Sequence, residues 1–251
     1  MQTRDRFSLS DLRQGAYCPR QFYFDLDTDD SPSISPVYLV LNQIAYRYGD
    51  FIEDPRGAVG DAVDLAEYDY GDDISPDLLD SEGIDLDEVR SRLRQTRTDS
   101  DFWDEIESPW REETYIDAGS EAQIHGTLDK ILSVEGEYRP SVIKTGTPPE
   151  NGVWEPHRIE ATAAARLVEL EFGEDVETAY VEYPRRGVVR ETRVSRRYER
   201  RLDSVLESLR KAVDGEIPSK TPNTTRCEPC DYSSNCSRKT SLLSRIRSKL
   251  S

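Results

Sequence analysis

The sequence has no long apolar run, and this absence excludes a membrane-spanning helix. The longest candidate run, Val37–Leu41, contains five residues, whereas a helix that spans a bilayer needs roughly 20. The first six residues have no apolar stretch behind them, so we expect no secretory signal. Together these absences predict a cytoplasmic protein without a membrane partner.

Lysine is scarce, although charged residues are abundant. The chain has 50 acidic and 33 basic side chains, a formal net charge of −17, and only six of the bases are lysine. Such an acidic balance argues against phosphate binding, which needs a positive surface. An acid excess with little lysine also fits a halophilic protein, because concentrated salt screens the repulsion between its charges. If that interpretation holds, the net charge says little about the partner.

The charges are segregated along the chain. Residues 50–120 contain 23 acids and six bases, whereas residues 183–220 contain 11 bases and six acids. The tail, residues 237–251, has five bases and no acid. For the acidic stretch a solvated surface is the better interpretation. For the two basic stretches, phosphate contact and a solvated surface are equally good interpretations.

Hydrophobic spacing and turn residues predict an α/β fold. Ser8 and Asp11 resemble a capping box, which predicts a helix from about Leu9. The other expected elements are helices at 37–53, 85–94, 156–170 and 196–213, and strands at 111–116, 123–132, 141–144, 177–183 and 188–194. This order indicates a mixed sheet flanked by helices. We expect one domain over residues 1–236, with an acidic helical insertion at about 54–104 because apolar residues there are few, and a basic tail at 237–251.

The four cysteines form a metal-ligand pattern. Cys227, Cys230 and Cys236 lie close together in the sequence, whereas Cys18 lies more than two hundred residues earlier. Four thiolates suit an iron–sulfur cluster or a structural zinc ion, and the spacing does not choose between them. The alternatives are disulfides, which cytosolic proteins rarely keep, and unrelated buried thiols.

The sequences around these cysteines resemble those of the CRISPR-associated RecB-like exonucleases. The matching segments are Cys18-Pro19-Arg20-Gln21-Phe22-Tyr23 and the stretch from Cys227 to Cys236. That family consists of PD-(D/E)XK nucleases whose chain ends are joined by a [4Fe–4S] cluster. The resemblance implies the same fold here, with one cluster ligand from Cys18 and three from Cys227, Cys230 and Cys236.

The resemblance extends to the catalytic motifs of a Mg²⁺- or Mn²⁺-dependent site. His125-Gly126-Thr127-Leu128-Asp129 is similar to the family's Gly-x-x-Asp strand, so Asp129 would be the first carboxylate. Ser141-Val142-Ile143-Lys144 is similar to its Glu-x-Lys strand, so Lys144 would be the catalytic lysine. Alternation along a strand places residues 142 and 144 on one face, so residue 142 should carry the second carboxylate. That residue is Val142.

Two further positions differ from the family pattern. Glu53 stands where these enzymes have a histidine, and Glu160 stands where they have a glutamine. Asp129, Lys144, Glu53 and Glu160 are therefore the candidate catalytic residues of a rearranged site, with Asp129 and Glu53 as candidate metal ligands. Without the cysteines, Asp129 and Lys144 would be interpreted as ordinary surface charges. Trp154 and the loop before it are predicted to be structural or to line the mouth of a groove.

The pattern supports three functions. The first is a metal-dependent nuclease, an exonuclease acting on DNA, especially single-stranded DNA, in CRISPR-type defence or repair alongside other proteins of those systems. The second is a catalytically inactive module on the same fold that binds DNA or a protein partner. The third is a zinc-stapled protein with no nucleic-acid role.

Overall fold

The computed structural model describes residues 5–26, 28, 34–71, 74–75, 77–221 and 224–237. The expected basic tail lies outside the described residues apart from Ser237. Within the described part, no helix is both long and apolar enough to cross a membrane.

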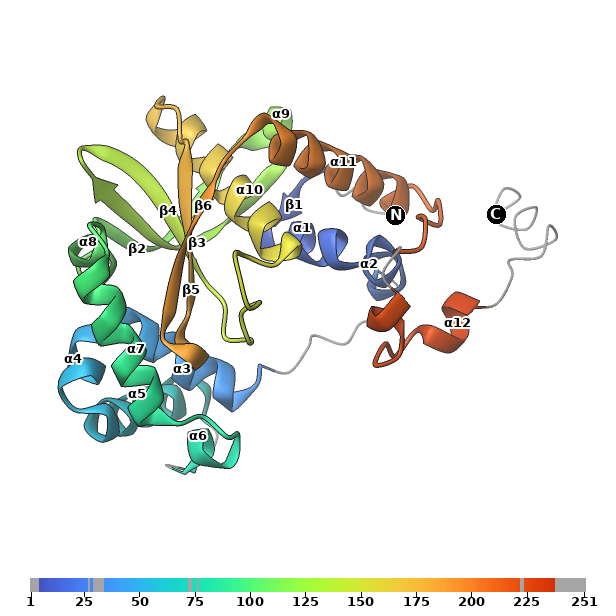
Figure 1. Ribbon diagram of the computed structural model, residues 1–251. Coiled ribbons are helices and arrows are strands. Elements are labelled where there is room, and N and C mark those ends of the chain that lie inside the picture. The colour runs from blue at the N-terminus through green and yellow to red at the C-terminus, as the bar shows by residue number, and fades with distance from the viewer. Residues whose placement is uncertain are drawn as a thin grey trace.

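A six-stranded mixed sheet lies at the centre of the molecule (Figure 1). Its strands are β1 Phe7–Ser8, β2 Arg111–Asp117, β3 Ile124–Val134, β4 Glu137–Ile143, β5 Thr178–Tyr183 and β6 Val188–Arg193. The order is β1-β3-β4-β5-β6, and β2 pairs antiparallel with β3. Strands β4 and β5 are parallel, which requires a crossover connection, and a long helix supplies it. The predicted α/β fold with a mixed, helix-flanked sheet is confirmed.

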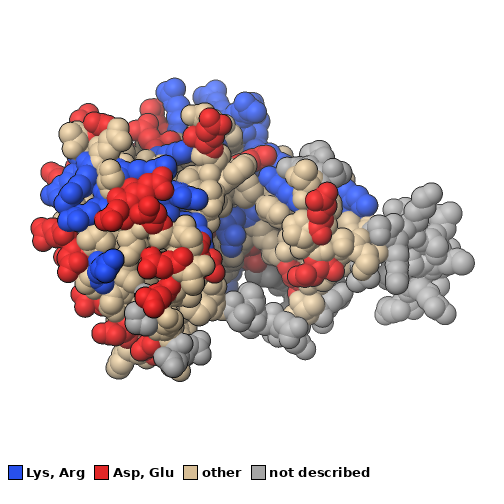
Figure 2. All heavy atoms as spheres, turned by 60° about the horizontal axis from the view of Figure 1, so that its bottom comes forward, with Lys and Arg blue, Asp and Glu red and all other residues tan. Residues whose placement is uncertain are grey.

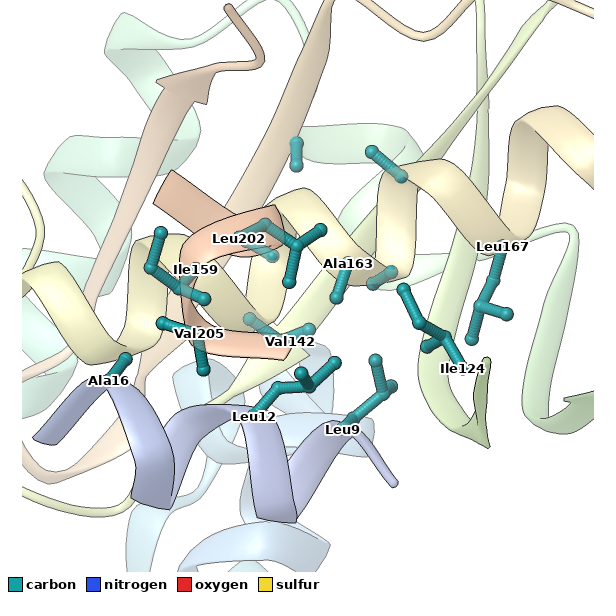
Figure 3. Packing of buried hydrophobic residues seen from close by; sticks show 14 of the residues in the cluster. Leu9, Leu12, Ala16, Ile124, Val142, Ile159, Ala163, Leu167, Leu202 and Val205 are labelled. Carbon is teal, nitrogen blue, oxygen red and sulfur yellow. The ribbon is translucent and has the colours of Figure 1, made fainter. Parts of the chain in front are cut away.

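One face of the sheet is covered by α1 Leu9–Tyr17, α10 Glu155–Phe172 and α11 Arg196–Val213. The predicted capping box is present at the start of α1, because Ser8 and Asp11 exchange hydrogen bonds. Figure 3 shows Leu9 and Leu12 packed beside Val142 of the sheet. A β-carbon at Gly126 would lie 2.7 Å from Leu9, so glycine is what lets α1 approach β3 this closely.

The other face is covered by helices from residues 36–107. They are α3 Pro36–Tyr46, α4 Tyr48–Glu53, α5 Pro55–Tyr70, α6 Leu78–Ser81, α7 Leu86–Asp99 and α8 Trp103–Glu107. These helices share a buried apolar cluster with the sheet, in which Leu93 and Trp103 join Leu132 and Tyr180. The segment expected to be an insertion therefore supplies the apolar layer that covers this face, even though its apolar residues are few.

Three elements differ from the expectation. The helix predicted over 37–53 is two helices, because the backbone at Arg47 (φ −135°, ψ 45°) leaves the helical region. The strand predicted at 141–144 begins earlier, at Glu137, and the helix predicted at 85–94 continues to Asp99. Outside the predicted helical insertion, the sequence analysis missed β1, α2 Pro19–Asp25, α9 Gly119–Ala122 and α12 Ser233–Ser237; within it, α5, α6 and α8 were not predicted individually.

Candidate functional site

A cavity of about 430 Å³ lies where α1 and α3 meet strands β3 and β4. Its lining includes three of the four predicted catalytic residues, Asp129, Lys144 and Glu160. We call it the carboxylate cavity. The three residues come from β3, from the end of β4 and from α10, so the fold brings together positions that are 31 residues apart in sequence.

Asp129 is held in place by the backbone of the neighbouring strand. Its Oδ2 accepts a hydrogen bond from the Ile143 amide at 2.7 Å. Burial raises the pKa of Asp129 to about 6, although nearby Lys144 and the hydrogen bond from Ile143 both favour the ionised form. The carboxyl group therefore changes protonation close to neutral pH, unlike an exposed aspartate.

Lys144 and Glu160 form an ion pair across the cavity. Lys144 Nζ lies 2.8 Å from Glu160 Oε1, and Arg13 Nε lies 3.5 Å from Oε2. Glu160 is buried, and no described residue donates a hydrogen bond to its Oε2. One oxygen of a desolvated carboxylate thus has an ion-pair neighbour but no donor, which makes it available to a further ligand.

Val142 occupies the cavity wall where the family pattern would have the second carboxylate. The side chain is buried and belongs to the apolar cluster beneath α1 and α10 (Figure 3). Among the predicted positions, the cavity therefore holds two carboxylates, Asp129 and Glu160, rather than an acid at residue 142.

The structure does not bring Glu53 to the carboxylate cavity. Glu53 ends α4, is exposed, and its carbonyl accepts a hydrogen bond from Arg90 Nη2 at 2.6 Å. Because the helix breaks at Arg47, it is α3 that faces the cavity, through residues such as Asn42 and Tyr46. The expectation that Glu53 and Asp129 would share one ion does not match this arrangement.

The charged residues of the cavity that were missed from the sequence include Arg13, Glu113 and Asp69 of α5. Arg13 is in α1, and no motif singles it out. Glu113 is in β2, where the strand register places it opposite Asp129, and its backbone is left-handed (φ 44°), which is uncommon for a residue other than glycine. Neither signal can be read from the amino-acid order alone.

His157 is neutral in this environment. Its Nδ1 lies 3.0 Å from the Tyr183 hydroxyl. Burial, with Lys144 and Arg13 nearby, lowers the pKa of His157 to about 3.

All four cysteines line a second cavity, of about 150 Å³, at the junction of the two ends of the described chain. Each is a free thiol, so no disulfide links them. Arg20 connects the two segments, since its Nε donates to Pro218 O at 2.7 Å and its Nη1 lies 3.4 Å from Cys236 Sγ. Arg226 Nη1 also donates to Tyr17 O, at 2.7 Å.

The four cysteines share this cavity, as a common ligand set requires. Among the described residues, no group of three His, Cys, Asp or Glu side chains is already arranged to hold a metal ion.

Comparison with known proteins gives one similar curated relative. No family model matches the chain. A segment of 112 residues is 28% identical to the CRISPR-associated exonuclease Cas4 of Thermoproteus tenax, which covers 45% of this chain and 58% of that protein. The match therefore spans little more than half of the relative's length. A solved structure of a candidate exonuclease from Eubacterium rectale superposes with a TM-score of 0.49 at 11% identity, covering 98% of this chain and 93% of that one.

Proposed function

We propose that this protein is a RecB-like DNA exonuclease of the Cas4 kind, with a rearranged set of carboxylates. The observation that supports it is the convergence of Asp129, Lys144 and Glu160 on one cavity. The family motifs assigned roles to Asp129 and Lys144, and Glu160 supplies an acid from α10 in place of one at Val142. The similarity to the Cas4 exonuclease of T. tenax points to the same class of reaction.

The donor set of this cavity fits a magnesium or manganese ion. Mg²⁺ is usually bound through one or two carboxylates, with water and substrate phosphate completing its shell. Asp129 and Glu160 are the two carboxylates that would hold it, and Glu160 Oε2 lacks a hydrogen-bond donor. The bound ion would polarise the phosphoryl oxygen and lower the pKa of a bound water.

The protein's own groups position the reactants. Lys144 Nζ, 2.8 Å from Glu160, can orient water toward a phosphate while it keeps the carboxylate in place. Arg13 supplies a second positive charge on the same side of Glu160. Asp129 is mainly ionised only above about pH 6, so cleavage should increase as the pH rises through that value.

We also propose that Cys18, Cys227, Cys230 and Cys236 hold a [4Fe–4S] cluster. The cavity that all four cysteines line supports a shared metal centre, and the resemblance of the flanking sequences to the RecB-like exonucleases favours the cluster over zinc. Single-stranded DNA as substrate, and other CRISPR or repair proteins as partners, belong to the same proposal.

The position of Val142 favours a second candidate, an inactive module that binds DNA or a protein. In this candidate Glu160 stays paired with Lys144 and Arg13, so that of the two predicted carboxylates in the cavity only Asp129 is left for a divalent ion. A single carboxylate would hold a divalent ion weakly.

A cleavage assay separates these functions. With Mn²⁺ and single-stranded DNA, we expect wild type to cleave and Asp129→Asn to lose at least about 100-fold in rate, because the ion loses a charged ligand. Glu53→Gln is the matched control, an acid outside the cavity, and should cleave like wild type. If wild type binds DNA without cleaving it, and Val142→Glu gains Mn²⁺-dependent cleavage, the inactive module is correct.

The cluster has its own test. Protein purified without oxygen should be brown and contain about four irons per chain. Because the cluster would close a loop of more than 200 residues, Cys18→Ser should lower the unfolding temperature of the whole domain as well as remove the colour. Colourless protein with one zinc per chain would contradict the cluster.

A further inference from the structure

A groove of about 470 Å³ adjoins the carboxylate cavity and has an unusual lining for so acidic a protein. It contains two arginines, Arg13 and Arg226, two aromatic side chains, Tyr17 and Trp154, and no acidic residue. The chain as a whole has 50 acids and a net charge of −17. We call this space the aromatic groove. Figure 2 shows a hollow between the part of the molecule that holds α3–α8 and the part that holds α2 and α12, with basic side chains visible inside it.

Two of the helices that line the carboxylate cavity, α1 and α10, also line this groove. On α1, Arg13 lines both spaces, and Tyr17 lies one turn further along the same face. On α10, Pro156 lines the groove, and Glu160 lies one turn beyond it in the carboxylate cavity. One helical turn is about 5.4 Å, so the two spaces are immediate neighbours.

The aromatic side chains are exposed but fixed. Trp154 is 46% exposed, and its indole Nε1 donates to Thr147 O at 2.9 Å. Tyr17 is 37% exposed, and the guanidinium of Arg226 lies 4.6 Å from its ring centroid. Rings that are held in position and exposed to solvent beside arginines are the usual platform for unpaired bases, because every base can stack on them.

We propose that the aromatic groove binds a base of single-stranded DNA by stacking on Trp154 and Tyr17, with Arg13 and Arg226 holding the adjacent phosphates. The inference rests on the proposed nuclease function and names how that site recognises its substrate. A base held there places the neighbouring phosphate at the carboxylate cavity, one helical turn away. In duplex DNA the faces of each base are covered by stacking on the neighbouring bases, so the groove selects single strands over duplex DNA.

A second basic space on the molecule is less suited to bases. The cavity between α10 and α11 is lined by four arginines around Tyr198, but also by Glu155. Arg201 is paired with Glu155 at 2.8 Å, and the ring of Tyr198 lies close to the guanidinium groups of Arg158 and Arg197, at 4.7 and 5.7 Å. Unlike the aromatic groove, this cavity therefore contains an acid, and that acid already pairs with one of its arginines.

The test measures binding without cleavage. A fluorescein-labelled oligothymidine is titrated in EDTA at fixed salt, and anisotropy gives the Kd of each variant. Trp154→Ala should bind about fivefold to 100-fold more weakly than wild type, the usual effect of removing a base-stacking ring. Trp154→Phe keeps a ring and should lose much less, which separates stacking from misfolding.

Trp110→Ala is the matched control. Trp110 is 39% exposed and also lies beside an arginine, with Arg111 at 4.1 Å from its ring centroid, but it does not line the groove. Trp110→Ala should bind oligothymidine with the same Kd as wild type. Urea unfolding of each variant checks that the fold is intact.

An oligonucleotide with abasic sites tests the stacking contact directly. Wild type should bind the abasic strand more weakly than oligothymidine, whereas Trp154→Ala should bind the two alike. If Trp154→Ala binds oligothymidine as tightly as wild type does, or if Arg200→Gln loses affinity and Trp154→Ala does not, the groove proposal is wrong while the nuclease proposal stands. Equal or tighter binding of duplex DNA by wild type also overturns it. If wild type binds no DNA at any salt concentration, both proposals fail.

Discussion

Two lysine–carboxylate pairs lie on opposite faces of the same sheet. Lys130 and Glu182 are fully buried beneath α3 and α8, with 3.0 Å between Nζ and Oε2. Lys144 and Glu160 are 2.8 Å apart on the other face, where they line the carboxylate cavity. The residue types and the distances are nearly the same, but the surroundings are not.

The difference lies in which hydrogen-bonding groups are satisfied. Lys130 Nζ donates to Ala45 O, Ile106 O and Glu182, which uses all three of its protons. The second oxygen of Glu182 accepts from Ser141 at 2.7 Å. In the other pair, Glu160 Oε2 has no hydrogen-bond donor among the described residues. A closed network holds the layers together, whereas an open one can accept a ligand.

The largest expected effect on stability is at the closed pair, Lys130 and Glu182, whose hydrogen-bonding groups are all satisfied. Lys130→Met leaves Glu182 as a buried charge without its cation, which should lower the unfolding free energy by about 3–5 kcal/mol. Urea unfolding at pH 7 measures the loss. The double variant Lys130→Met/Glu182→Leu removes both charges and should be more stable than the single variant. A loss below about 1 kcal/mol for Lys130→Met would show that the network is not closed.

The next largest expected effect is the change of the unfolding free energy with pH that the raised pKa of Asp129 causes. Because this pKa is raised from 3.8 to about 6, the folded protein holds a proton between about pH 4 and 6 that the unfolded chain has released. The unfolding free energy should therefore fall as the pH rises through this window, by at most about 3 kcal/mol from this group. Asp129→Asn does not titrate and should lose correspondingly less stability over the same window.

Urea unfolding at pH 4, 5, 6 and 7 in EDTA compares the two proteins. Added Mn²⁺ should reduce the difference, because a bound cation favours the ionised carboxylate. Parallel stability curves for wild type and Asp129→Asn would contradict the raised pKa.

The smallest expected effect on stability is at the open pair, Lys144 and Glu160, in which Glu160 Oε2 has no hydrogen-bond donor among the described residues. Lys144 is 14% exposed at its side chain, and Glu160 retains Arg13 at 3.5 Å when the lysine is removed. Lys144→Met should therefore lower the unfolding free energy by only about 1 kcal/mol, while cleavage falls by about 100-fold or more. If Lys144→Met destabilises the fold as much as Lys130→Met does, both pairs stabilise the fold equally and the distinction between a closed and an open pair is wrong.

Local patterns predicted the elements better than the contacts between them. The helix predicted at 196–213 matches α11 because Leu202, Val205 and Leu209 recur at helical spacing and join the buried cluster that α1 and α10 share. The motifs also selected Asp129 and Lys144, which the fold does bring to one cavity. Each of these signals lies within a short stretch of sequence.

Contacts between distant segments could not be predicted in this way. Lys130 and Glu182 are 52 residues apart, and neither belongs to a motif that would mark it as buried. Glu53 was chosen because it stands where the family has a histidine, but it lies in α4, beyond the break at Arg47, and does not line the cavity. A helix break of one residue depends on packing against neighbouring layers, which spacing does not reveal.

The late arrival of the partners of α1 affects how the protein is made. Leu9 and Leu12 pack in one cluster with residues of α10 and α11, which end at residues 172 and 213. β1 likewise pairs with β3 across more than 110 residues. At ribosomal rates of about 5–20 residues per second, α1 waits roughly 10 to 40 s for the last of these segments to be synthesised.

During that interval the apolar residues of α1 in the nascent chain have no α10 or α11 to pack against. In this layer α1 is synthesised first, but it can complete its packing only after α10 and α11 have been synthesised. The layer of α3–α8, whose members are close together in sequence, has most of its helices available early. A circular permutation that moves residues 5–26 to follow residue 237 would remove this delay and leave the native contacts in place.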